Sequence, residues 1–222
     1  EHIFHRTWRL VCHESELAAP FDYRTFELSG QPLFCIRSSE GRIRTFINAC
    51  SHRGARLLVE PAGNARRISC FYHHWTYSAE GSCIGIPRAE GYDSSGLEKD
   101  NLGLREVRTE VKMGLVFVNL DSEAEALDAF LDGALDHLAP IMDTQPLETF
   151  HFSRSVINCN WKAWQETNLD LYHENMHVVL RRTQMNAMAM EDRKLQLYGN
   201  GHAGSGKMVA AYKGYSGFAG RG

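Results

Sequence analysis

Residues 50–54 read Cys-Ser-His-Arg-Gly, and further along the chain residues 70–77 read Cys-Phe-Tyr-His-His-Trp-Thr-Tyr. Each stretch joins a cysteine to a nearby histidine on a loop that is expected to follow a strand. Thiolates and neutral imidazoles are ligands that proteins use for iron–sulfur and zinc sites. The two stretches therefore predict one metal centre, clamped between two loops.

Two kinds of centre use this set of ligands. A Rieske [2Fe–2S] cluster takes thiolates on one iron and imidazoles on the other, whereas a structural zinc ion takes all four. A zinc finger is a mini-domain that the metal folds, but these loops lie within a β-rich region long enough for its own core. We therefore expect Cys50, His52, Cys70 and His73 to hold a Rieske cluster, with a Cys2His2 zinc site as the alternative. His74 could compete with His73, but the two-residue gap after Cys70 favours His73.

The region around these loops is predicted to be β-structure. Short runs of β-favouring residues flank turns that contain glycine, which is typical of hairpins. The pattern occurs three times, in residues 32–37 with 43–47, 75–77 with 83–86, and 104–111 with 115–118. Regularly spaced short strands predict a small β sandwich or barrel.

The pattern changes after Asp121. Apolar residues at helical spacing predict a helix over 123–138, ending before Pro140. Residues 150–157 are expected to form a strand and 160 to about 179 a second helix. The glycine-rich stretch 199–206 is expected to be a mobile loop near a substrate entrance.

Composition narrows the class of protein. The chain has 222 residues and a net charge of -3, so bulk nucleic-acid binding is not favoured. No apolar run reaches the roughly 20 residues that a membrane helix needs. Outside the two loops, Cys12, Cys35, Cys83 and Cys159 are expected to be small apolar residues in strands. Without an export signal, six cysteines indicate a reducing, cytoplasmic setting.

With Glu80-Gly81 and Gly85-Ile86-Pro87, the two loop motifs resemble the Rieske domain of ring-hydroxylating oxygenase α subunits. His74 departs from the pattern, since that family usually has a small residue there. Respiratory Rieske proteins are also similar, but carry a further cysteine in each loop. The resemblance implies an α+β fold. An all-β Rieske domain over 1–121 is followed over 122–222 by the start of a helix-grip (START/Bet v 1-like) catalytic domain.

A second metal site is expected on the predicted helix after residue 160. His173 and His177 are four residues apart and share one helical face. Taken alone, such a pair is more often a surface pair. The resemblance implies that both bind a mononuclear non-haem Fe(II), with a carboxylate ligand beyond residue 222, so the chain is expected to be the front part of a longer α subunit. It also implies that Asp170 links the two metals; the plain alternative is a polar residue on a solvated face.

The resemblance implies a terminal oxygenase that uses O2 to hydroxylate an aromatic compound or aromatic acid, as a dioxygenase. Electrons would come from a ferredoxin or an NAD(P)H-dependent reductase, and the assembly would be a homotrimer or an α3β3 complex with a small β subunit. The alternatives are a Rieske monooxygenase or demethylase, or an electron carrier without oxygenase activity. A basic group near the loops is either a docking patch for an acidic donor or a solvated charged face: Arg42, Arg44, Arg53, Arg56, Arg66 and Arg67.

Overall fold

The computed structural model describes residues 3–96, 98–142, 145–169 and 195–205. The chain divides into two compact units. The first comprises Glu1–Leu127 with Ile141–His151, and the second comprises Asp128–Pro140 with Phe152–Gly222. Among the described residues, no helix has the length and apolar character needed to span a bilayer.

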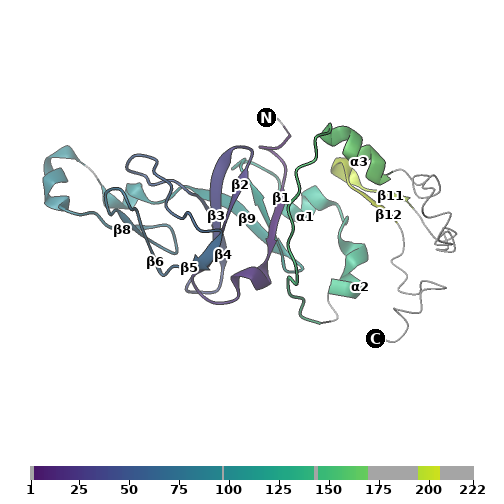
Figure 1. Ribbon diagram of the computed structural model, residues 1–222, viewed down its shortest axis with the longest axis horizontal. Helices are drawn as coiled ribbons and strands as arrows, with labels where there is room; N and C mark the ends of the chain where they lie inside the picture. Colours follow the sequence, from purple (N-terminus) through teal and green to yellow (C-terminus); the bar gives the residue numbers. More distant parts are fainter. Residues whose placement is uncertain (1–2, 97, 143–144, 170–194, 206–222) are drawn as a thin grey trace. The chain divides into compact units, whose positions relative to one another are not determined.

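The first unit consists mainly of antiparallel strands (Figure 1). A seven-stranded sheet has the order β1-β10-β9-β4-β3-β2-β5, and a three-stranded sheet has the order β6-β7-β8. The strands are β1 Arg9–His13, β2 Asp22–Leu28, β3 Gln31–Arg37, β4 Ile43–Ile47, β5 Ala62–Asn64, β6 Arg67–Ser69, β7 Thr76–Ser78, β8 Cys83–Gly85, β9 Glu106–Lys112 and β10 Leu115–Asn119.

All three predicted hairpins are confirmed, as β3–β4, β7–β8 and β9–β10. The β7–β8 turn shows why glycine is required. Gly81 has φ +86°, and a Cβ atom there would collide with the ring of Phe46. Only glycine reaches this backbone region without strain, so the turn can pack directly against the main sheet.

Two apolar clusters fill the first unit. One lies within the main sheet and includes Leu33, Val116 and Val118. The other joins the main sheet to the small sheet through Phe34, Phe46 and the two cysteines of the loop motifs, together with Trp75 and Tyr77. The candidate ligands are thus attached to a packed core.

The irregular and helical parts are short. The 3-10 helices lie at Glu14–Leu17, Ala89–Ser95, Lys99–Leu102, Asp136–Leu138 and Gly199–Gly201. The α-helices are α1 Leu127–Leu131, α2 Ala139–Met142 and α3 Trp161–Leu169. The second unit also holds the hairpin of β11 Leu195–Leu197 and β12 Ala203–Ser205.

Three sequence expectations about local structure are wrong. The single helix over 123–138 is broken, because Asp132 and Gly133 have φ values of +47° and +76°, which a right-handed helix cannot contain. Residues 150–157 form no strand; they have no pairing partner, and Phe150 and Val156 are exposed. Cys159 is exposed in this irregular segment, whereas Cys12, Cys35 and Cys83 are buried on strands as expected.

The 199–202 turn of the second unit caps α1. A short helix leaves its last carbonyl groups without intrahelical partners. Asn200 Nδ2 donates to the carbonyl of Phe130 at 3.0 Å, and His202 Nε2 lies 2.9 Å from the same oxygen. The backbone N–H of Gly199 donates to Asp132 Oδ2 at 2.7 Å. These contacts tie the β11–β12 turn to the helix. The expected role near a substrate entrance stays a prediction.

Candidate metal centre

The first loop begins at the end of β4 and closes on itself around Cys50. The backbone N–H of Cys50 donates to the carbonyl of Ala55, and the N–H of Gly54 donates to the carbonyl of Cys50, both at 2.8 Å. Gly54 has φ +71°, and the space around its Cα is open. Glycine is therefore favoured at this corner by its backbone conformation alone.

The second loop, between β6 and β7, repeats this closure. Cys70 N–H donates to the carbonyl of Trp75 at 2.8 Å, and His74 N–H donates to the carbonyl of Cys70 at 2.9 Å. His74 has φ +57° and stands at the corner that Gly54 occupies in the first loop. His74, which stands where the family that the chain resembles usually has a small residue, is therefore a non-glycine residue in a left-handed backbone position.

Asn48 holds the base of the first loop. Its side-chain oxygen accepts the N–H groups of Leu57 and Leu58 at 3.1 and 3.0 Å, and its Nδ2 donates to the carbonyl of Leu58 at 2.7 Å. The side chain is fully buried, so all three bonds are shielded from water. Sequence reasoning missed this residue; the available signal was a polar amide between a strand and the first cysteine.

The four predicted ligands come together where the two loops meet. The side chains of Cys50 and Cys70 are buried, while His52 and His73 are half-buried. The two imidazole rings lie 4.7 Å apart between centroids, at 71° to each other. His74 is exposed at the loop corner, so the geometry favours His73 as the partner of His52.

One orphaned atom tests whether these residues fit a metal centre. His52 Nδ1 is buried and has no hydrogen-bond partner among the described residues, an arrangement that costs free energy unless another partner satisfies the nitrogen. Desolvation, followed by electrostatic interaction with the neighbouring His52 and Arg53, lowers the pKa of His73, which favours the neutral imidazole that metals bind. The residues therefore fit the predicted cluster.

No three His, Cys, Asp or Glu side chains in the described ranges form a group suited to a single ion. A two-iron cluster does not need three side chains around one ion, because each iron takes only two protein ligands and sulfide completes its coordination. The pairing of two thiols and two imidazoles is compatible with this requirement.

Tyr77 lies directly against the first loop. Its hydroxyl oxygen accepts the Ser51 N–H at 3.0 Å and lies 3.2 Å from Cys50 Sγ. Burial, and then the bond with Cys50, raises the pKa of Tyr77. The phenol therefore stays protonated and can donate to the sulfur. This role was not predicted, although Tyr77 belongs to the second sequence motif.

The predicted second metal site is not described. Helix α3 begins at Trp161, close to the predicted start at residue 160. Asp170, His173 and His177 lie outside the described residues. Their assignment, together with the expected carboxylate ligand beyond the chain, stays a prediction.

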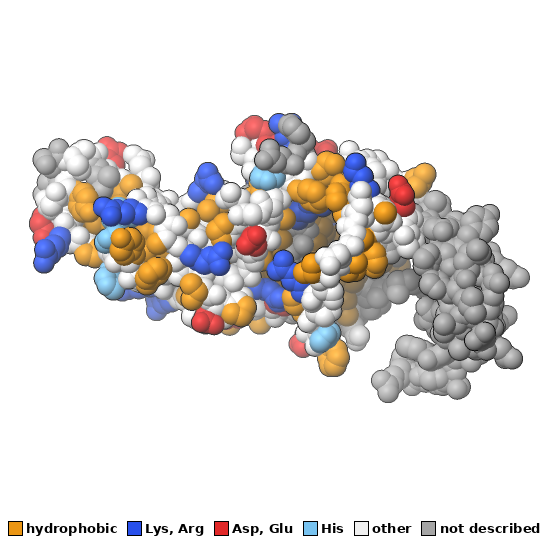
Figure 2. All heavy atoms as spheres, turned by 45° about the horizontal axis from the view of Figure 1, so that its top comes forward, with side chains coloured by type: hydrophobic (Ala, Val, Ile, Leu, Met, Phe, Trp, Pro, Cys, Tyr) orange, Lys and Arg blue, Asp and Glu red, His pale blue; other side chains and the backbone are white. Residues whose placement is uncertain are grey.

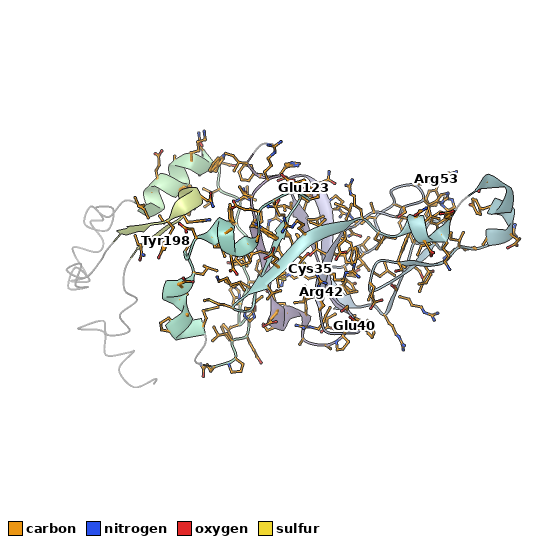
Figure 3. All side chains as sticks on the ribbon, turned by 180° about the vertical axis from the view of Figure 1, so that it is seen from behind. Cys35, Glu40, Arg42, Arg53, Glu123 and Tyr198 are labelled. Carbon is orange, nitrogen blue, oxygen red and sulfur yellow. The ribbon has the colours of Figure 1, made fainter. Side chains whose placement is uncertain are left out.

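The surface near the loops combines arginines with exposed aromatic rings. Arg53 and Arg56 are exposed, and Phe71 and Tyr72 are 71% and 54% exposed. Figure 2 shows hydrophobic, histidine and basic side chains gathered at the end of the first unit that carries β6 and β8, and Figure 3 places Arg53 at that end. Arg44 differs, because its Nε donates to Glu106 Oε1 at 2.7 Å within the main sheet.

Comparison with known proteins supports the fold and the centre. Residues 7–103 match the family described as Rieske [2Fe-2S] domain. The α subunit of 2-aminobenzenesulfonate 2,3-dioxygenase from Alcaligenes sp is 45% identical over 97% of this chain and 55% of that protein. The α subunit of methanesulfonate monooxygenase hydroxylase from Methylosulfonomonas methylovora is 35% identical over 100% of this chain and 56% of that protein.

Among solved structures, a naphthalene 1,2-dioxygenase bound to phenanthrene superimposes with a TM-score of 0.68. It is 35% identical, over 74% of this chain and 38% of that chain. The chain thus spans about half the length of the curated relatives that it matches over nearly its whole sequence. It carries a Rieske [2Fe–2S] domain and is homologous to the N-terminal part of the α subunits of Rieske ring-hydroxylating dioxygenases.

Proposed function

We propose that this chain is the N-terminal part of the terminal oxygenase component of a Rieske non-haem iron system, and that Cys50, His52, Cys70 and His73 hold its cluster. The ligand assignment rests on two observations. Two loops, each closed by hydrogen bonds around its cysteine, meet at the four residues, and His52 Nδ1 is buried there without a hydrogen-bond partner among the described residues. The similarity to dioxygenase α subunits supports the oxygenase reading.

In this proposal, the chain's own residues bind and shield the cluster, which supplies one-electron transfer when bound. Cys50 and Cys70 are buried, which keeps water away from their thiolates. With Cys50 as a thiolate ligand, the Tyr77 hydroxyl, 3.2 Å from Cys50 Sγ, would donate its hydrogen to the sulfur, and such bonds tune a metal centre from outside its ligand shell. The half-buried imidazoles form the side of the centre nearer to solvent.

We place the Rieske domain at 1–121 and the start of the catalytic domain at 122–222. Within the second part, we assign His173 and His177 to a mononuclear iron and Asp170 to the link between the two centres. These assignments rest on the spacing of the residues and on the resemblance of this segment to oxygenase α subunits. They require a further carboxylate ligand, which the resemblance places beyond residue 222.

The names of the two relatives that match nearly the whole chain suggest a substrate class. One is named for 2-aminobenzenesulfonate and the other for methanesulfonate. Both compounds carry a sulfonate group, although only one is aromatic. We therefore propose hydroxylation of an aromatic sulfonate as a dioxygenase, with sulfonate monooxygenation as the second candidate.

We further propose that an acidic ferredoxin or reductase domain delivers electrons at the loop end of the first unit. Arg53 and Arg56 are exposed on the first loop, and Phe71 is exposed on the second. Basic charge around an apolar centre suits an acidic partner, because complementary charge accelerates encounter. Assembly of the oxygenase as a homotrimer, or with a small β subunit, belongs to the same proposal.

The test uses the full-length oxygenase, supplied with a ferredoxin and a reductase. Iron and sulfide are quantified, the reduced protein is examined by electron paramagnetic resonance, and products are identified from 2-aminobenzenesulfonate, methanesulfonate, benzoate and benzene. The proposal expects a Rieske signal, a third iron per chain and hydroxylation of a sulfonate. A cluster without the third iron and without product would identify an electron carrier, while a colourless zinc protein would refute the ligand assignment.

A further inference from the structure

Two side chains at the end of the second loop and the start of β7 contact the first loop. Trp75 and Tyr77 are two residues apart, so in an extended segment they point to the same side. Trp75 contacts the ring of His52, and Tyr77 contacts the sulfur of Cys50. The short stretch 75–77 therefore contacts both predicted ligands of the first loop, each through a different side chain.

The contact between Trp75 and His52 is a parallel stack. The ring centroids are 4.8 Å apart and the planes differ by 8°. Trp75 is only 3% exposed, and its backbone carbonyl is held by the N–H of Cys70. Tyr92 packs edge-on against Trp75, at 6.5 Å and 88°. A flat ring that is itself fixed leaves the stacked imidazole little freedom to tilt.

The other imidazole is supported differently. The ring nearest to His73 is that of Tyr72, with centroids 3.8 Å apart. Tyr72 is 54% exposed and stacks in turn on exposed Phe71. Exposed side chains keep rotational freedom that buried ones lose, so His52 has a rigid support and His73 a mobile one.

We propose that Trp75 is a positioning residue that fixes the imidazole plane of His52, while Tyr77 acts separately on the sulfur of Cys50. The stretch 75–77 thus orients the imidazole ligand of one iron and tunes the thiolate ligand of the other. This inference rests on the proposed ligand set. It concerns the orientation of a ligand that any Rieske function would use, so it can be tested without turnover.

The experiment compares Trp75→Leu and Trp75→Phe with two matched variants in protein labelled with ¹⁵N-histidine. Trp8→Phe alters another buried tryptophan, whose Nε1 donates to the carbonyl of Glu125. Tyr77→Phe removes the other contact made by the same segment. Pulsed electron paramagnetic resonance of the reduced cluster measures the histidine nitrogen couplings, which depend on the orientation of each imidazole. Release of iron to a chelator measures how firmly the ligand is held.

Trp75→Leu should shift one pair of histidine couplings and speed iron release about tenfold, and Trp75→Phe should shift the same couplings less. Trp8→Phe should leave them unchanged, whereas Tyr77→Phe, which acts on the cysteine ligand, should not reproduce the shift of Trp75→Leu. Wild-type couplings in folded Trp75→Leu would overturn the inference. If that variant does not accumulate, wild-type couplings in Trp75→Phe would do the same. A wild-type protein without a Rieske signal would instead refute the ligand set, so the two failures are distinguishable.

Discussion

The two loops of the centre share a backbone but differ in their support. Each closes through the same two hydrogen bonds around its cysteine and turns at a left-handed corner. In the first loop, Asn48 bonds to the loop backbone, Trp75 stacks on His52 and Tyr77 accepts a backbone N–H. In the second loop, Phe71 and Tyr72 are exposed. Backbone closure therefore places the cysteines, while side-chain support decides how rigidly each loop holds its histidine.

The largest effect is expected from replacing a predicted ligand of the cluster. His73→Ala should abolish the cluster, because one iron loses a protein ligand. His74→Ala should retain most of the cluster, since His74 is exposed at the loop corner. Iron and sulfide content and the visible spectrum measure both outcomes. Loss of the cluster in His74→Ala with retention in His73→Ala would reverse the ligand assignment.

Removing the clamp of the first loop should destabilise the unit strongly. Asn48→Ala leaves two N–H groups and one carbonyl of the loop unpaired in a buried setting, with an expected loss of about 2–4 kcal/mol. Urea unfolding of the holoprotein measures this free energy.

A second buried asparagine supplies the control. Asn119 accepts the Asp121 N–H at 3.0 Å and donates to the Arg6 carbonyl at 3.3 Å. Asn119→Ala should destabilise the unit and leave the rate of iron release unchanged, whereas Asn48→Ala should speed that release. Equal rates in the two variants would remove the special role of Asn48.

Removing the hydroxyl bond to the sulfur should shift a potential with little effect on folding. The donated hydrogen favours the reduced cluster, which carries more negative charge, so Tyr77→Phe should lower the reduction potential. A differential bond energy of about 1 kcal/mol corresponds to roughly 40 mV for one electron. Redox titration measures the shift, with Tyr23→Phe as the buried tyrosine control. An equal shift in both variants would contradict the assignment.

The smallest effects concern the two corners. Gly54→Ala meets no neighbouring atom within 4 Å, so it should cost only about 1 kcal/mol through its left-handed backbone. His74→Gly removes the same left-handed strain from the folded state, but it also makes the unfolded chain more flexible, which favours unfolding. The expected net effect is a stabilisation of about 0.5 kcal/mol. Thermal unfolding of the holoprotein compares the pair. Destabilisation by His74→Gly would indicate that the imidazole makes a contact of its own.

The sequence predicted the three hairpins, because alternation and glycine turns are local signals. The ligand set, taken from the Cys-to-His spacing, stays a proposal. Sequence reasoning failed where distant residues decide the outcome. Tyr77 and the cap on α1 depend on contacts between distant segments that no local pattern encodes, and Asn48 depends on Leu57 and Leu58 at the far end of its own loop. The helix over 123–138 failed for a local reason, since apolar spacing outweighed the signal of Asp132-Gly133.

The adjacency of β4 and β9 has a consequence for how the domain is built. Thr45 pairs with Val107, so the chain leaves the main sheet after β4 and returns beside the same strand. The cluster-bearing segment is therefore an excursion between two neighbouring strands, attached to the main sheet also through β5, the shared core and the hydrogen bond from Arg44 Nη1 to the carbonyl of Glu80. Loss of metal should raise amide exchange in the excursion first, while the strands around it remain protected. The same topology makes the excursion a natural unit for transplantation, because its two ends already lie side by side.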